Sequence, residues 1–228
     1  MAFAPDSGTA AESPYAAFIR RETRLSAPPL VPEIRLHLAD AITPIWSASE
    51  ATLEANGVPP PYWAFAWVGG QALARHVLDH GSAAMSEKRV LDLACGCGIA
   101  AIAAAMRGAA VTAADIDPFA LAAVRLNAEA NGVALAMSGE DFLANPHAPC
   151  PWDIVLAGDV CYERAMAARM MDFLRAAAAR GLTVWLADPG RNYLPKDGLV
   201  EIARYLVPCT REIEDAEEKT VRIFEVAR

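Results

Sequence analysis

The chain has 228 residues, 54% of them hydrophobic, and a formal net charge of −8. This length suits one α/β domain with a short extension, and the apolar content is enough for a core. Acidic residues outnumber basic ones by 28 to 20. That balance argues against nucleic acid as a partner and favours a cationic one, such as a lysine-bearing protein surface.

The sequence shows no membrane span. Its longest apolar run, Leu93–Met106, is too short and contains two glycines. The first residues lack the basic region and apolar block of a signal peptide. The five cysteines have no framework spacing and indicate reduced thiols, so we expect a cytoplasmic protein. The oligomeric state stays open, and a monomer is compatible with the sequence.

The N-terminal part is predicted to be an extension of the main domain. Residues 1–13 indicate a frayed tail, Tyr15–Thr23 a short helix, and Pro32–Leu38 the start of another element. Three prolines at 59–61 then interrupt the chain. We therefore treat residues 1–58 as an N-terminal tail and helical extension, and residues 59–228 as the main domain.

Strands and helices are then predicted to alternate. Apolar periodicity indicates helices over residues 70–80, 99–106, 119–130 and 166–177. It indicates strands over residues 89–93, 110–114, 133–137, 154–157 and 182–187. Two β-prone segments, 207–213 and 220–226, follow with a charged turn and no helix between them, which predicts an edge hairpin. The pattern predicts an α/β fold with a Rossmann-like, seven-stranded methyltransferase sheet that ends in an antiparallel hairpin.

A glycine turn between the first strand and its helix indicates a cofactor site. Gly96 and Gly98 allow backbone to approach a ligand, and the helix start beyond them attracts anionic groups. Asp92 is placed to face the ammonium group of S-adenosylmethionine. The same run, Gly96-x-Gly98-x-x-Ala101, also satisfies the loose nicotinamide fingerprint, so it is ambiguous alone.

Residues after the next strands favour S-adenosylmethionine. Asp115 is placed to accept hydrogen bonds from the ribose hydroxyls, and Asp141 and Phe142 to meet the adenine amino group and ring. Asp159 follows the fourth strand, and the carboxyl ends of parallel strands converge on one crevice. Asp141 has the weakest individual case, because acidic loop residues are common.

Several of these residues have plain structural alternatives. Asp92 could merely cap its turn, and Asp117 before Pro118 is best read as a helix N-cap. Cys95 and Cys97 have the spacing of a metal pair, but no second pair or histidine cluster accompanies them. We therefore expect turn residues there and no metal.

The chain from Pro61 onward resembles the family 16 methyltransferases, which modify lysines of particular proteins. The resemblance rests on the aromatic run Tyr62–Trp67, the glycine turn, the segment Asp115–Pro118 and the motif Asp159-x-x-Tyr162. Two further segments resemble the branch that modifies the electron-transfer flavoprotein β-subunit: Asp188–Pro195 and Glu212–Asp215. One departure is Val68, where the family often has proline.

The resemblance implies that Trp67, Asp92, Gly96 and Asp115 line the cofactor site. It implies that Asp159 and Tyr162 face the substrate amine and act as the catalytic pair. Ring faces of Tyr162, with Trp63 or Trp67, are suited to contact the cationic nitrogen or sulfonium.

Two alternatives remain open at this stage. The acceptor could be a small amine or a ribosomal protein, because one fold serves many acceptors. The chain could also be a nicotinamide-dependent or non-catalytic nucleotide-binding module. The sequence does not give the acceptor lysine or the number of methyl groups added. It also does not decide whether Asp159 acts as a base or only orients the amine.

Overall fold

The computed structural model describes residues 13–40 and 60–228, so the predictions for residues 1–12 and 41–59 lie outside the described part. The helices are α1 (Pro14–Glu22), α3 (Val68–Met85), α4 (Ile99–Met106), α5 (Pro118–Ala130), α6 (Arg164–Ala179) and α7 (Arg211–Glu214), with 3-10 turns η1 (Tyr62–Ala64) and η2 (Phe142–Ala144). The strands are β1 (Arg24–Ser26), β2 (Leu36–Leu38), β3 (Arg89–Leu93), β4 (Ala110–Ala114), β5 (Ala136–Ser138), β6 (Ile154–Gly158), β7 (Thr183–Asp188), β8 (Leu199–Pro208) and β9 (Glu218–Val226).

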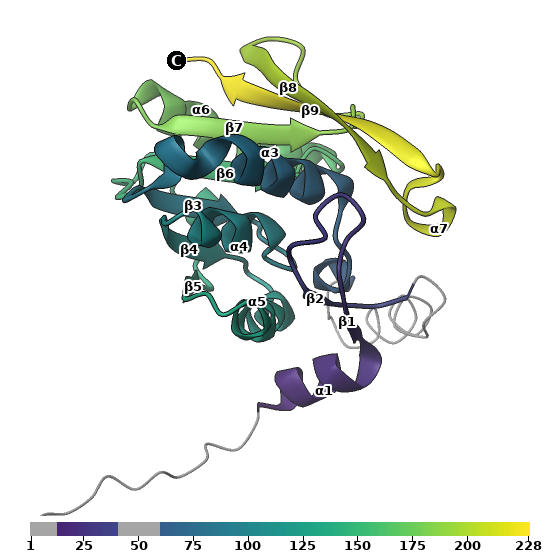
Figure 1. Ribbon diagram of the computed structural model, residues 1–228. Coiled ribbons are helices and arrows are strands. Elements are labelled where there is room, and N and C mark those ends of the chain that lie inside the picture. The colour runs from purple at the N-terminus through teal and green to yellow at the C-terminus, as the bar shows by residue number, and fades with distance from the viewer. Residues whose placement is uncertain (1–12, 41–59) are drawn as a thin grey trace, which may run out of the picture.

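Seven strands form one mixed sheet in the order β5-β4-β3-β6-β7-β9-β8. The first five strands in this order are parallel, and β9 runs antiparallel to both β7 and β8 (Figure 1). This topology confirms the predicted fold class. It also places the ends of β3, β4 and β6 side by side, so the loops that follow them meet at one edge of the sheet.

Helices cover both faces of the sheet. The apolar sides of α3 and α4 pack against one face, where α4 is almost entirely buried because alanines leave room for close contact. The helix α6 covers the other face through a stripe of four residues: Met170, Phe173, Leu174 and Ala177. The site described below therefore lies on a rigid sheet supported from both sides. In the part of the chain that the structure describes, no helix is long and apolar enough to cross a membrane.

The described part of the N-terminal extension contains a small sheet as well as a helix. The strands β1 and β2 pair antiparallel, and α1 starts at Ser13, whose hydroxyl caps it. The extension is fixed to α5, because Asn127 Oδ1 accepts a hydrogen bond from the His37 backbone at 2.7 Å. The extension was predicted to be helical, and its described part contains this two-stranded sheet in addition to α1.

The C-terminal hairpin is present, but its first strand was misplaced. The predicted strand 207–213 is replaced by β8, which ends at Pro208, and by the single helical turn α7. The prediction that no helix separates the two strands was therefore wrong. The strand β8 lies at the sheet edge, where Glu201 and Arg204 are exposed and interrupt the apolar pattern by which a buried strand is recognised.

Candidate active site

The turn between β3 and α4 uses its two glycines differently. Gly98 has φ +76° and a Cβ there would lie 2.9 Å from Val124 Cγ2, so this glycine allows the turn to pack on α5. Gly96 has φ +53°, and the nearest atom to a Cβ would be the Tyr62 carbonyl oxygen at 3.9 Å. Gly96 is therefore needed for its backbone conformation, and its surface stays open to the pocket.

Asp92 lies near the end of β3 and is buried. Its Oδ2 accepts a hydrogen bond from the Ala101 backbone at 2.9 Å, which fits the structural alternative of a turn cap. Burial raises the pKa of Asp92 to about 7. A cationic partner would stabilise the ionised form of this buried carboxyl group, because a nearby positive charge offsets the free-energy cost of burying the negative charge.

Asp115 connects the end of β4 to the glycine turn. Its Oδ2 accepts from the Gly96 backbone and its Oδ1 from the Asp117 backbone, each at 3.0 Å. Burial raises its pKa. Asp117 in turn accepts from the Phe119 backbone at 2.9 Å, which confirms its predicted role as the N-cap of α5.

Asp141 and Phe142 lie apart from the pocket lining. Asp141 caps η2 through the Leu143 backbone, and its Oδ2 lies 2.8 Å from Arg169 Nη2. Phe142 packs edge-on against Trp152 with ring centroids 5.1 Å apart. The contact of these two residues with adenine stays a prediction.

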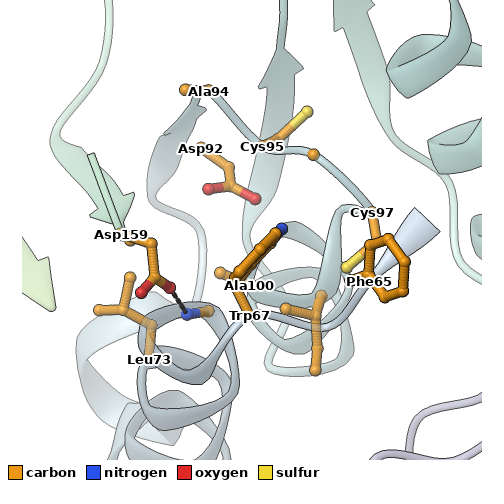
Figure 2. Close-up of a pocket in the computed structure, with 13 residues that line it drawn as sticks. Phe65, Trp67, Leu73, Asp92, Ala94, Cys95, Cys97, Ala100 and Asp159 are labelled. Atoms are coloured by element: carbon orange, nitrogen blue, oxygen red, sulfur yellow. Dashed lines mark hydrogen bonds between the residues drawn. The ribbon is translucent and has the colours of Figure 1, made fainter. Parts of the chain in front are cut away.

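A pocket opens where the turn after β3 meets the end of β6 and the start of α3. It holds about 370 Å³ of space when the open solvent at its mouth is included. Figure 2 shows the carboxyl groups of Asp92 and Asp159 beside it, with the rings of Phe65 and Trp67. Its lining residues are Phe65, Trp67, Gly70, Leu73, Asp92, Ala94, Cys95, Gly96, Cys97, Ile99, Ala100, Gly158 and Asp159.

Cys95 and Cys97 belong to the pocket lining. Burial raises the pKa of Cys97 to about 12 and that of Cys95 well above its ordinary value, so both thiols stay protonated. Among the described residues, no group of three or more His, Cys, Asp or Glu side chains is arranged to hold a metal ion.

The aromatic run before α3 divides between the pocket and the core. Trp67 Nε1 donates to the Tyr62 carbonyl oxygen at 2.9 Å, and the Tyr62 ring lies between the rings of Trp67 and Tyr162, with centroids 5.9 and 5.5 Å away. Tyr162 is 41% exposed. These three rings form an aromatic group beside the pocket. Burial raises the pKa of Tyr162 to about 12, so its hydroxyl keeps its proton.

Trp63 lies elsewhere. It is 2% exposed and stacks on Phe119 of α5 with ring planes 9° apart. The ring belongs to the core cluster around Ile19 rather than to the pocket lining. This position argues against the predicted contact between Trp63 and substrate.

Asp159 is held in a strained conformation directly after β6. Its φ is +59°, and such conformations persist only where the surroundings impose them. Here Oδ2 accepts from the Gly70 backbone at 3.1 Å and Oδ1 from Arg191 Nη2 at 2.7 Å. Burial raises the pKa of Asp159 to about 6, although the Arg191 charge opposes the rise.

Arg191 is the residue that sequence reasoning missed. Its Nη2 also contacts Glu214 Oε1 at 2.9 Å, and its guanidinium carbon lies 5.9 Å from the centre of the Trp67 ring. The segment beginning at Asp188 was noted only as a feature of one branch. The arginine inside it was the available signal, because an arginine after a strand end can pair with carboxylates of neighbouring loops.

The pocket residues fit S-adenosylmethionine. Asp92 supplies a buried carboxylate for an ammonium group, and the turn at Gly96 supplies open backbone before a helix start, which suits a carboxylate. Trp67 supplies a ring face for a cation.

Comparisons with known proteins agree with this geometry. The family described as ribosomal protein L11 methyltransferase matches residues 73–158. The magnesium protoporphyrin IX methyltransferase of Synechocystis, solved with bound S-adenosylhomocysteine, is similar in structure with a TM-score of 0.51 at 16% identity, over 81% of this chain and 98% of that one. That similarity shows the fold.

The sequence identity to curated relatives is higher. The electron transfer flavoprotein beta subunit lysine methyltransferase of Xenopus laevis is 41% identical over 178 residues, covering 77% of this chain and 70% of that protein. The protein of the same name from Danio rerio is 38% identical over 188 residues, covering 81% and 71%. The chain therefore belongs to the electron transfer flavoprotein β-subunit lysine methyltransferase family and is an S-adenosylmethionine-dependent protein-lysine methyltransferase.

Proposed function

We propose that this protein methylates lysine side chains of the electron transfer flavoprotein β-subunit. The observation that carries the proposal is the extent of similarity to relatives of that name, which covers 77% of the chain in the Xenopus laevis protein. The ribosomal protein L11 methyltransferase of Dechloromonas aromatica is 43% identical, but over only 40% of the chain. A match confined to part of the chain is expected where only the cofactor-binding half is shared.

The proposed roles follow the position of each side chain. We assign Trp67, Asp92 and Gly96 to the methyl donor, because all three line the pocket. Asp115 is assigned to the ribose, and its contact with the Gly96 backbone supports this by placing it next to the turn. Gly98 supports the turn through its packing on Val124.

Asp159 and Tyr162 are assigned to the acceptor amine. When bound, the donor supplies a methyl group already activated by its sulfonium, so the protein must align a neutral amine with that group and exclude competing orientations. The Asp159 carboxylate, fixed by Gly70 and Arg191, accepts a hydrogen bond from the amine and stabilises the positive charge that develops on nitrogen.

Asp159 is better suited to orient the amine than to deprotonate it. A lysine ammonium has a pKa of about 10.4, whereas that of Asp159 is about 6. Proton transfer from the ammonium to this carboxylate is therefore unfavourable by roughly four pH units. We propose that the amine reaches the site after losing its proton to solvent.

The test is methyl transfer from labelled S-adenosylmethionine to purified flavoprotein, comparing the wild type with Asp159→Asn and Asp159→Ala. We expect label on the β-subunit, with a loss of about a hundredfold or more in both variants. Asparagine keeps the size and hydrogen-bonding ability of the side chain but lacks its charge. Label that persists in Asp159→Asn at the wild-type rate would remove the proposed charge stabilisation. If the wild-type protein binds the cofactor but leaves the flavoprotein unlabelled, the proposed acceptor is wrong.

We further propose a cytoplasmic, metal-free enzyme that does not bind nucleic acid. The net charge of −8 and the five cysteines, none of them in a disulfide, support this.

A further inference from the structure

One guanidinium nitrogen joins two buried carboxyl groups beside the pocket. Arg191 Nη2 lies 2.7 Å from Asp159 Oδ1 and 2.9 Å from Glu214 Oε1. Asp159 and Glu214 are 9% and 6% exposed. The contact joins the end of β6, the loop after β7 and the turn α7, which are distant in the sequence.

The loop after β7 is built to hold Arg191 in this place. Asp188 Oδ1 accepts from the backbone of both Gly190 and Arg191 at 2.7 Å, which closes a tight turn. Gly190 has φ +95°, a backbone conformation that residues with a side chain rarely adopt. The turn directs the guanidinium toward Asp159, where it also lies over the Trp67 ring.

The charges around Asp159 do not balance. Arg191 faces it as the cation, while Glu214 and Asp188 are acidic groups close enough to raise its pKa. Losing the arginine would leave buried carboxyl groups without a counter-ion, and such groups take up protons. A protonated Asp159 would neither attract a developing ammonium nor keep its present orientation.

We propose that Arg191 is a positioning residue for methyl transfer, which holds Asp159 as an oriented anion, and that Glu214 sets how strongly Arg191 does so. The inference rests on the proposed role of Asp159 at the acceptor amine. It assigns a function in the site to the connector between β8 and β9, through a side chain of α7. Arginine suits this role because its planar fork stays charged when buried.

A purely structural role is the competing explanation, in which Arg191 only fastens the loop to α7. Both explanations place the same charges beside Asp159, so they differ in whether methyl transfer depends on the charge of Asp159. Removing the arginine charge should raise the pKa of Asp159 by about one to three pH units. Removing the Glu214 charge should lower it, because a like charge disappears while Arg191 remains. A positioning role predicts that kcat changes with these shifts, whereas a fastening role predicts lower stability in both variants with the kcat of the folded protein unchanged.

The experiment compares Arg191→Met, Arg191→Lys and Glu214→Gln with the wild type. Arg204→Met is the matched control, because Arg204 is an exposed arginine of β8 that pairs with Glu201. The Asp159 carboxyl carbon is followed by NMR titration of protein labelled at aspartate, with Asp159→Asn used for assignment. Cofactor Kd, and kcat and KM for the flavoprotein, are measured on the same samples.

We expect Arg191→Met to raise the pKa of Asp159 and to lower kcat at least about tenfold, with the cofactor Kd within about twofold of the wild type. Arg191→Lys should recover part of kcat, and Arg204→Met should change neither quantity. Unchanged titration of Asp159 in Arg191→Met, or shifts of the same sign in Arg191→Met and Glu214→Gln, would overturn the proposal. If Arg191→Met does not fold, Arg191→Lys and Glu214→Gln still test the signs. If wild-type enzyme leaves the flavoprotein unlabelled, the proposed acceptor fails, whereas the titration still decides whether Arg191 holds Asp159 as an anion.

Discussion

Gly69 leaves the space that the side chain of Asp159 occupies. A Cβ at Gly69 would lie 2.5 Å from Asp159 Oδ2 and 2.9 Å from the Ala187 carbonyl oxygen. The start of α3 therefore approaches the ends of β6 and β7 so closely that only glycine fits there. The position of the carboxylate depends on this approach as well as on Arg191.

We expect Gly69→Ala to lower kcat for methyl transfer by at least about tenfold and stability by about 1–3 kcal/mol, because the methyl group must displace either Asp159 or the β7 backbone. Gly81→Ala in the same helix is the control. A Cβ there would meet the flexible side chain of Met85 at 3.1 Å, so we expect little change in kcat. Steady-state kinetics and thermal unfolding check both, and equal kcat in the two variants would contradict the prediction.

Asp92 should make the cofactor-free protein less stable as pH rises. Its folded pKa of about 7 lies above the ordinary value of 3.8. The folded form therefore holds the proton more tightly, and this contribution to stability is present at pH 4 and is lost as pH rises to about 7. Asp92→Asn still offers an oxygen to the Ala101 backbone but cannot ionise.

The measurement for Asp92 is Tm against pH for wild type and Asp92→Asn without cofactor. The difference between the two curves removes the contribution of the other carboxyl groups. We expect the Tm of Asp92→Asn, relative to wild type, to increase between pH 4 and pH 7, and its affinity for S-adenosylmethionine to fall at least about tenfold. Parallel curves would show that folding does not raise the pKa of Asp92, and unchanged affinity would leave it only the capping role.

Substitution of Gly98 should destabilise the protein for two reasons, its backbone conformation and its packing. Gly98→Ala combines a positive φ with a contact of 2.9 Å to Val124 Cγ2, so we expect a loss of about 1–3 kcal/mol. Val124→Ala added to it should recover the steric part and leave the backbone part. A double-mutant cycle measured by urea unfolding checks this, and strict additivity of the two changes would rule out the contact.

Substitution of Trp63 should lower stability, whereas substitution of Trp67 should weaken cofactor binding. Trp63→Leu removes a stacked ring from the core, so we expect a loss of about 2–4 kcal/mol with the kinetics of the folded protein nearly unchanged. Trp67→Leu should instead weaken S-adenosylmethionine binding, because Trp67 lines the pocket. Calorimetric titration below the Tm of each variant tests the pair. A large loss of cofactor affinity in Trp63→Leu would contradict the assignment of Trp63 to the core.

The parallel half of the sheet was predictable because its elements have local signals. The strands β3 and β4 have the predicted bounds, since short apolar runs between turn residues specify buried strands. The strand β8 was not predictable in this way, because it pairs with one neighbouring strand only and carries charged residues at its exposed positions. The turn α7 begins after Thr210 in a segment of β-prone residues, so local preference indicated a strand there.

Some residues of the candidate site were likewise predictable from local sequence signals, and others were not. Asp92, Gly96 and Asp159 could be placed together because they lie at or just after the ends of predicted strands, and parallel strands bring their ends together. The ion pairs of Arg191 span 32 and 23 residues, and the pair with Glu214 depends on how the hairpin folds back, which has no periodic signal. Trp63 was misassigned because neighbours in a 3-10 turn point to different sides, and composition does not show which side meets the pocket.

The order of strands has a consequence for synthesis on the ribosome. β8 precedes β9 in the sequence, but within the sheet it pairs with β9 alone. A nascent chain must therefore carry β8 as an unpaired segment, with the apolar side chains of Val200 and Leu206, until β9 has emerged and inserted beside β7. The connector with Glu214 docks in the same event, so a growing chain with a finished cofactor pocket would still lack the Glu214 contact to Arg191. Chaperone dependence and translation rate should then act on this hairpin more than on the rest of the fold.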